Sequence, residues 1–254
     1  MMRPLFLSHG SPMIAVEQTG YTSFLREYGR TLKPKAVVMF TAHWESDVLT
    51  VSSTDGEYKT IYDFGGFPPE LYRVKYPAKG SVEAASELAN MLESGGIPVR
   101  KDTSRGLDHG VWTLLVHLFP DADIPVVQAS VNPFLPMEEQ YGIGQAVRSL
   151  GEQGVLVIGS GATVHNFRTM NMSATEADPR AVEFDDWLIE HMRSNDLESL
   201  FHVMEKAPHA SMAVPRAEHF VPLYIAMGSG KAEDVKVLHQ SYEFGSLSYL
   251  ALQF

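Results

Sequence analysis

Three short apolar runs in this chain each end in a turn that carries a histidine. The runs and their histidines are residues 5–7 with His9, 37–40 with His43, and 155–158 with His165. Continuous apolar runs predict buried parallel strands, and open α/β sheets bind their ligands just beyond the carboxyl ends of such strands. Imidazole is the commonest neutral metal ligand and the usual acid/base group near neutral pH. The pattern therefore predicts a metal-dependent enzyme.

The metal ligands favoured by this pattern are His9 and His43. A histidine in a turn is more often a structural hydrogen-bond partner, but two of them after parallel-type strands favour a shared metal. The third ligand lies in the segment that contains Glu218 and His219. Three nitrogens, or two nitrogens and a carboxylate, can hold one face of a metal and leave other positions open. Local chemistry does not choose between these two side chains.

His109 and His165 are the candidates for acid/base catalysis. His109 precedes an apolar helix expected over residues 111–119, and His165 follows the third strand-and-turn signal. The turn Gly159-Ser160-Gly161 resembles a nucleophile elbow only superficially, because that motif requires Gly-x-Ser-x-Gly spacing. A serine hydrolase is therefore disfavoured.

The other five histidines are expected to have structural roles. His117 falls within the apolar helix, and we expect it in the core or an interface. His191 and His202 lie on amphipathic helices as solvated or capping groups, and His239 lies near the end of a late strand. The loop containing His209 leads towards the 218–219 segment, so a role in supporting the site or in binding substrate stays open for it.

Composition narrows the class of protein. The chain has 254 residues, of which 44% are hydrophobic and 20% charged, as expected of a globular protein with a substantial core. Its net charge of −11 and the lack of any basic stripe argue against a nucleic-acid partner. There is no cysteine, so any metal must be bound by nitrogen and oxygen.

No targeting or membrane segment is expected. The N-terminal apolar run is too short for the core of a signal peptide, and no stretch is long enough to cross a bilayer. We therefore expect a soluble cytoplasmic protein without a membrane partner. No feature of the sequence indicates its oligomeric state.

Strand-like and helix-like segments alternate along the whole chain. Strands are expected at 4–7, 35–41, 47–53, 97–100, 124–130, 154–159 and 235–240. Helices are expected to begin after the caps Ser81, Asp178 and Asp196, with Val82 on the apolar face of the first helix and Met204 on that of the third. The alternation predicts an α/β fold: a single-domain three-layer structure whose central, mostly parallel or mixed sheet is flanked by helices. Residues 1–254 are expected to form one catalytic domain. The irregular stretch 60–79 is either a lid over the site or a surface loop pinned by its aromatic residues.

Five short segments occur in an order and at spacings that together identify a protein family more specifically than any one segment does. They are LSHGSP at 7–12, AHW at 42–44, LDHGVW at 107–112, GSGATVHN at 159–166 and EHFVPL at 218–223. With these segments the chain resembles the class III extradiol ring-cleavage dioxygenases, most closely their 4,5-DOPA dioxygenase branch. Residues 62–72 and 76–78 also resemble that branch, and the resemblance spans essentially the whole chain.

The resemblance implies a division of roles among the histidines. It implies that His9, His43 and His219 are the metal ligands. It also implies that His109 and His165 lie beside the metal as acid/base and oxygen-handling residues. Protocatechuate-type members of the wider class use two histidines and a glutamate. This chain departs from them by carrying His219 at the third position, as the DOPA-type branch does.

The activity implied is ring opening of a catechol such as DOPA with molecular oxygen, at a non-heme Fe(II) site, to give a muconic semialdehyde. The expected partners are thus a small catechol and O2. Three imidazoles also suit zinc, so Zn(II) is the alternative bound or copurifying metal, and a zinc-dependent hydrolase is the alternative function. A fold that has lost catalysis and binds a partner is a third hypothesis. Arg216 and Tyr224 are the candidates to meet a substrate carboxylate.

Overall fold

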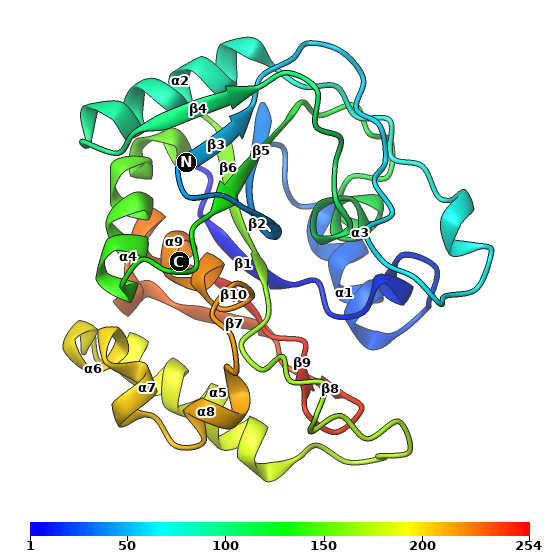
Figure 1. Cartoon of the computed structure of the whole chain (residues 1–254), viewed down its shortest axis with the longest axis vertical. Coiled ribbons are helices and arrows are strands. Elements are labelled where there is room, and N and C mark those ends of the chain that lie inside the picture. The colour runs from blue at the N-terminus through cyan, green and yellow to red at the C-terminus, as the bar shows by residue number, and fades with distance from the viewer.

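The computed structural model describes residues 1–254 as a central sheet between layers of helices (Figure 1). The strands of the sheet are β1 (Leu5–Ser8), β2 (Ala36–Glu45), β3 (Leu49–Ser52), β4 (Val99–Asp102), β5 (Val126–Val131), β6 (Val155–Gly161), β7 (Lys236–His239) and β10 (Ala251–Gln253). Their spatial order is β4-β3-β5-β2-β6-β1-β10-β7, and β8 (Tyr242–Glu243) and β9 (Leu247–Ser248) form a separate hairpin.

The middle of the sheet is parallel and its margins are mixed. Strands β5, β2, β6 and β1 are paired in parallel, whereas β3 joins β5, and β10 joins both β1 and β7, in antiparallel fashion. The expected single-domain α/β fold with a mostly parallel or mixed sheet is thus confirmed. The carboxyl ends of the parallel strands β1, β2 and β6 meet at one edge, which brings residues far apart in sequence together.

Nine α-helices flank the sheet. They are α1 (Gly20–Gly29), α2 (Val82–Ser94), α3 (His109–Leu118), α4 (Met137–Ala146), α5 (Pro179–Arg193), α6 (Leu197–Phe201), α7 (Val203–Lys206), α8 (Ala210–Ala213) and α9 (Val221–Ser229). The three expected caps are present, because Ser81, Asp178 and Asp196 each accept a hydrogen bond from a backbone N–H of the first helical turn. Loop 60–79 contains only one short 3-10 helix, Leu71–Arg73.

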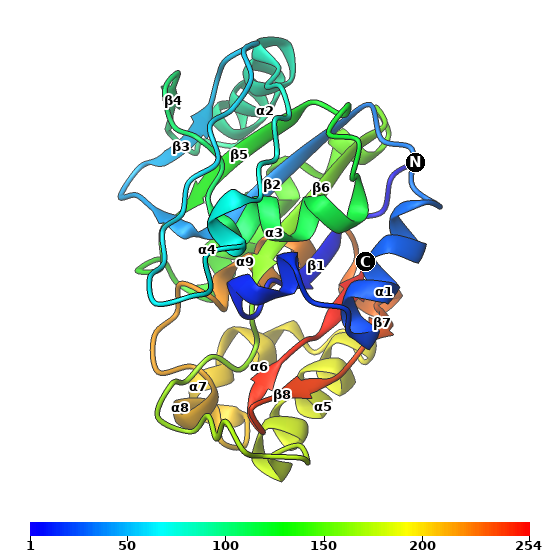
Figure 2. The same cartoon turned by 90° about the vertical axis from the view of Figure 1, so that its right-hand side faces the viewer.

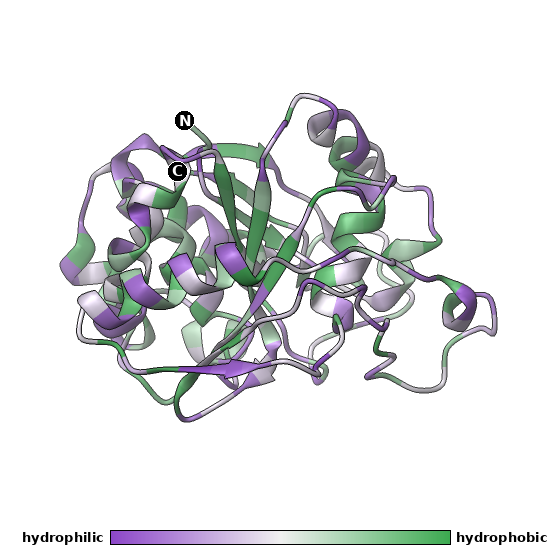
Figure 3. Ribbon diagram, turned by 90° about the horizontal axis from the view of Figure 1, so that it is seen from above, coloured by the Kyte–Doolittle hydropathy of each residue, from purple (hydrophilic) through white to green (hydrophobic).

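Both faces of the sheet are buried, which explains the continuous apolar runs. Val37 and Met39 of β2 pack with α1 and α3 on one face, whereas Val38 and Phe40 pack with α2, α4 and α9 on the other. Figure 2 looks onto the layer of α1 and α3, and Figure 3 shows the green, hydrophobic strands between the two layers. This packing holds the strand ends that carry the histidines.

Some local expectations were wrong. The segment after Asp196 is divided at His202 into α6 and α7, and Met204, expected on the apolar side, is exposed. Val82, expected on the apolar face of α2, is also exposed. Strand β10 was not expected, because its few residues gain their partners only from β1 and β7. No helix is both long and apolar enough to cross a membrane.

Asp185 of α5 is a buried carboxylate that should make stability depend on pH. Its Oδ2 accepts hydrogen bonds from Tyr242 (2.9 Å) and Ser248 (2.6 Å), and burial raises its pKa to about 6. Between about pH 4 and pH 6, Asp185 therefore keeps its proton in the folded protein but has released it in the unfolded chain. The contribution of Asp185 to stability is present below about pH 4 and is lost as pH rises through about 6, by roughly 2–3 kcal/mol in total.

The comparison with Asp185→Asn tests this expectation. The free energy of unfolding, measured with urea from pH 4 to 7, should fall with pH in the wild type relative to Asp185→Asn. A difference between the two proteins that does not change with pH would contradict the raised pKa.

Candidate metal centre and active site

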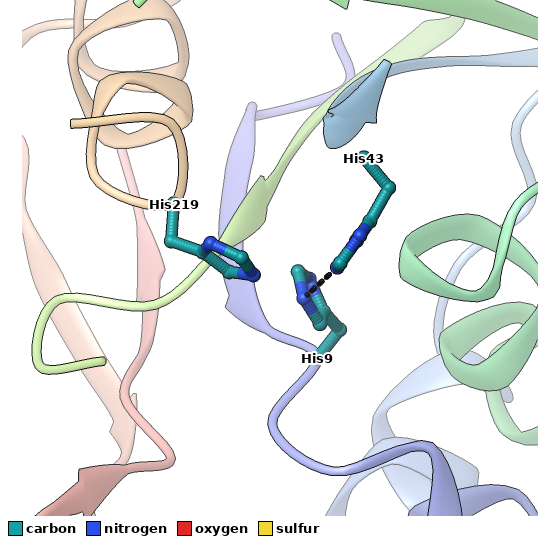
Figure 4. Close-up of side chains that lie close together, drawn as sticks. All are labelled: His9, His43 and His219. Atoms are coloured by element: carbon teal, nitrogen blue, oxygen red, sulfur yellow. Dashed lines mark hydrogen bonds between the residues drawn. The ribbon is translucent and has the colours of Figure 1, made fainter. Parts of the chain in front are cut away.

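Three histidines from distant segments converge at the carboxyl end of the sheet (Figure 4). His9 follows β1, His43 lies near the end of β2, and His219 lies in the turn that leads into α9. The Nε2 atoms of His9 and His43 are 2.9 Å apart, and one ring nitrogen from each of the three histidines lies within 4.8 Å of the others. Two metal–nitrogen bonds of about 2.0–2.1 Å hold their nitrogens at most roughly 4.2 Å apart, so small side-chain shifts would bring all three nitrogens onto one ion.

His9 is oriented by Ser160, whose Gly-Ser-Gly segment forms the end of β6 and not the expected turn. Ser160 Oγ donates its hydrogen to the carbonyl oxygen of Gly110 and lies 2.9 Å from Nδ1 of His9. Because the hydroxyl hydrogen is already engaged, the serine oxygen accepts the Nδ1–H of His9. The lone pair of His9 is thereby left on Nε2, which faces the other two histidines.

The other two rings have carboxylates at their Nδ1 atoms. Nδ1 of His219 lies 3.1 Å from Oε1 of Glu218, and Nδ1 of His43 lies 3.6 Å from Oδ2 of Asp63. Carboxylates and hydroxyls beside the second ring nitrogen are the usual supports of metal-bound histidines. Glu218 therefore lies where it would support His219.

Replacing Ser160 should weaken metal binding without removing a ligand. Ser160→Ala leaves Nδ1 of His9 without its acceptor, and the loss of such a support typically lowers metal affinity about 10–100-fold. Titration with a divalent metal measures the effect. Ser229→Ala, which removes a buried serine that bonds only within α9, is the matched control and should bind like the wild type. Wild-type affinity in Ser160→Ala would contradict the role of this hydroxyl.

The imidazoles of the cluster are kept neutral. Burial, and then the neighbouring histidines, hold the pKa values of His9 and His219 well below the ordinary value, and the pKa of His43 is also lowered by burial and then His109. Neutral imidazole is the form that binds metal. Three neutral nitrogen donors and no thiolate are a donor set that fits iron or zinc.

His109 and His165 flank the three converging histidines. The ring of His165 stacks on that of His219, with centroids 3.8 Å apart and planes 8° from parallel. The ring of His109, at the first position of α3, lies 3.8 Å from that of His43. The structure therefore brings all five expected site residues into one cluster. Burial lowers the pKa of His165, opposed by Glu218.

Sequence reasoning missed Asp63, which connects loop 60–79 to the site. Its Oδ1 accepts a hydrogen bond from the backbone N–H of His109 (3.0 Å) and lies 2.9 Å from Nδ1 of the same residue. The ring N–H is not aligned for a straight hydrogen bond, so the side-chain contact is electrostatic. Burial acts to raise the pKa of Asp63, but His109 and then His43 hold it below its ordinary value. An aspartate within an aromatic and glycine-rich loop was the only available signal.

The Gly-Ser-Gly segment at the end of β6 allows helix α9 to approach this strand. A Cβ at Gly159 would lie 2.1 Å from the carbonyl oxygen of Pro222, and one at Gly161 would lie 2.0 Å from that of His219. These distances are shorter than any real Cβ contact. Only glycine at both positions lets the backbone of His219 come beside β6, while Ser160 between them supports His9.

The remaining histidines lie outside the cluster. His117 is buried, and its Nε2 contacts the carbonyl oxygen of Ile14, as expected of a core residue. His191 stacks on Trp187, and His202 is exposed. His239 packs beside Tyr21 and Phe24, and His209 pairs with Glu183.

The two residues expected as candidates for substrate-carboxylate binding differ in access. Tyr224 is fully buried and donates to the carbonyl oxygen of Leu200, so it does not face a substrate. Arg216 is exposed, and its guanidinium pairs with Glu45 and Glu218.

Neutral histidines gathered at the strand ends of an α/β fold are the arrangement expected of a metal-dependent enzyme. The family described as the catalytic LigB subunit of aromatic ring-opening dioxygenase matches residues 4–253. The chain belongs to this family of metal-dependent ring-opening enzymes, which confirms the expected kinship and enzyme class.

Two relatives match this chain over nearly its whole length. The chain is 39% identical to a 4,5-DOPA dioxygenase extradiol of Beta vulgaris, across 98% of this chain and 95% of the relative. It is 34% identical to a protein of the same name from Escherichia coli K12, across 99% and 94%. A crystal structure of an uncharacterized Escherichia coli K12 protein superposes with a TM-score of 0.84 at 30% identity, covering all of both chains.

Proposed function

We propose that residues 1–254 form one catalytic domain that opens the ring of a catechol such as DOPA with O2, giving a muconic semialdehyde by extradiol cleavage. The proposed metal ligands are His9, His43 and His219, and the proposed metal is Fe(II). The observation that carries the proposal is the convergence of these three neutral imidazoles. The names of the relatives support a DOPA-like substrate.

Iron is proposed because bound Fe(II) can mediate electron transfer between a catechol and dioxygen, whereas zinc has no redox chemistry. Zn(II) suits the same three nitrogens and is the alternative occupant on isolation. A zinc hydrolase is not favoured, since the named relatives are dioxygenases. The cytoplasmic location stays a prediction.

We assign proton transfer to the two flanking histidines. His165 has a lowered pKa and is neutral at pH 7, so it can accept a proton from a catechol hydroxyl beside the ligand His219. His109 carries Asp63 at its Nδ1, which leaves Nε2 to donate to or accept from the oxygen being handled. Proton transfer by a positioned side chain typically contributes about 10²–10⁴-fold to rate.

Two phenylalanines are proposed to shelter the substrate ring from water. Phe64 meets His109 edge-on with centroids 5.4 Å apart, and the exposed Phe167 meets His165 edge-on at 4.9 Å. Each proton-transfer residue is thus adjacent to an aromatic side chain from a separate loop. Exclusion of water strengthens the electrostatic interactions in the site.

The test is oxygen consumption by protein reconstituted without air. The protein loaded with Fe(II) and given DOPA or another catechol should, on admission of air, consume O2 in an amount equimolar with the yellow ring-opened product. The Zn(II)-loaded protein is the control and should consume none. Turnover with zinc and without oxygen would support the hydrolase, and inactivity with both metals across a panel of catechols would overturn the proposed function.

A further inference from the structure

A buried carboxylate, that of Asp108, is linked to the backbone of the proposed ligand His43. Asp108 is fully buried; its Oδ1 accepts a hydrogen bond from Thr41 Oγ1 (2.8 Å), and its Oδ2 accepts one from Arg105 Nη2 (3.1 Å). Its backbone N–H donates to Gln128 Oε1 (3.1 Å). Asp108 therefore has firm partners on both carboxylate oxygens, and none of them is a metal ligand.

The two side chains bound by Asp108 both reach the backbone of His43. The N–H of His43 donates to Thr41 Oγ1 (3.2 Å), and its carbonyl oxygen accepts from Arg105 Nη2 (3.1 Å). The guanidinium of Arg105 also lies over the ring of Trp44, 4.7 Å from its centroid. The two polar backbone groups of His43 are thus tied to a single carboxylate through two side chains.

The backbone of His43 is not held by regular strand pairing. Pairing of β2 with β5 is regular up to Phe40 opposite Ala129, and then shifts its register before Glu45 opposite Val131. His43 lies inside that irregular stretch. Pairing of β2 with β6 ends at Thr41 opposite Ser160. Side chains, and not a regular ladder, therefore hold the backbone at the ligand position.

The side chains of Thr41 and Asp108 are closely packed against Gly110. A Cβ at Gly110 would lie 2.8 Å from Thr41 Oγ1 and 3.2 Å from Asp108 Oδ1, so only glycine fits against this group. A buried ion pair tolerates the removal of one partner poorly, because the remaining charge is left uncompensated.

We propose that Arg105 and Asp108, with Thr41, are positioning residues that fix the metal ligand His43; we call these three the His43 clamp. They act through the backbone of His43 and touch neither substrate nor metal. The inference rests on the proposed role of His43 as a metal ligand.

The experiment measures Co(II) binding to the full-length, metal-free protein by its visible absorption. Asp108→Asn and Arg105→Met should each bind Co(II) about 10–100-fold more weakly than the wild type, with an altered absorption spectrum, because the support of a ligand is lost. The double variant should be no weaker than the weaker single variant, because residues that act as one unit are not additive. If Asp108→Asn does not fold, Thr41→Val removes one of the two links, that to the N–H of His43, without any change in charge.

Two controls separate the possible outcomes. Asp185→Asn removes another fully buried carboxylate, remote from the clamp, and should retain wild-type Co(II) affinity. Equal loss of affinity in Asp185→Asn would mean a general destabilisation and would overturn the clamp. His43→Ala should lose the metal. If it does so while the clamp variants retain wild-type Co(II) affinity, the proposed role of the clamp is wrong. If His43→Ala itself retains the metal, the proposed metal site is wrong.

Discussion

Replacing His219 with alanine should abolish tight metal binding and, with it, oxygen consumption. The substitution removes one of three converging nitrogens and leaves two, so the loss should exceed the roughly 10–100-fold effect typical of a supporting residue. Glu218 contacts Nδ1 of His219 and is not among the three converging ring nitrogens. Metal content after dialysis and Co(II) titration of the apoprotein measure the effect.

Glu218→Gln is the matched comparison for His219→Ala. The amide keeps the size of the side chain and an oxygen acceptor for Nδ1 of His219, so the metal should be retained with at most a moderate loss of affinity. If Glu218→Gln loses its metal as completely as His219→Ala does, the third ligand is the carboxylate. The site would then be of the two-histidine, one-carboxylate kind.

His165→Ala should retain its metal and lose turnover. The ring of His165 stacks on His219 without lying among the three converging nitrogens, so its removal leaves the proposed ligands in place. The loss of a proton-transfer group should lower kcat by about 10²–10⁴-fold. Steady-state oxygen consumption at saturating catechol, together with metal content, measures both effects.

Two variants give this prediction its controls. His191→Ala removes a histidine that stacks on Trp187 far from the cluster, and its kcat should equal that of the wild type. His109→Ala should also retain metal and lose rate, because His109 is the second proposed proton-transfer residue. Loss of the metal in His165→Ala would contradict our division between ligands and proton-transfer groups.

Loop 60–79 contains a residue, Asp63, whose role the sequence did not predict. Its aromatic and glycine-rich sequence predicted a lid or a pinned surface loop, and neither reading assigned a role to Asp63. The carboxylate lies 46 positions before His109, whose backbone N–H it binds. No local spacing relates the two, so only the path of the loop over α3 decides that they meet.

The Gly-Ser-Gly segment of β6 is a second case in which the sequence alone did not reveal a role. Its sequence lacks the spacing of a nucleophile elbow and predicts no other role for Ser160. In the structure Ser160 supports His9, 151 positions away, and the flanking glycines allow β6 and the segment of His219 to touch. Close approach of two backbones leaves no pattern that a single sequence reveals.

What the sequence by itself determined is the α/β fold, the buried strands, the helix caps and the set of histidines at strand ends. These follow from hydrophobic periodicity and local capping chemistry, which act over a few residues. Only the tertiary structure decided that five histidines form one cluster and that Ser160, Asp63 and the His43 clamp surround it. Hydrogen bonds and ion pairs between remote segments depend on how the chain packs, and local sequence does not encode their partners.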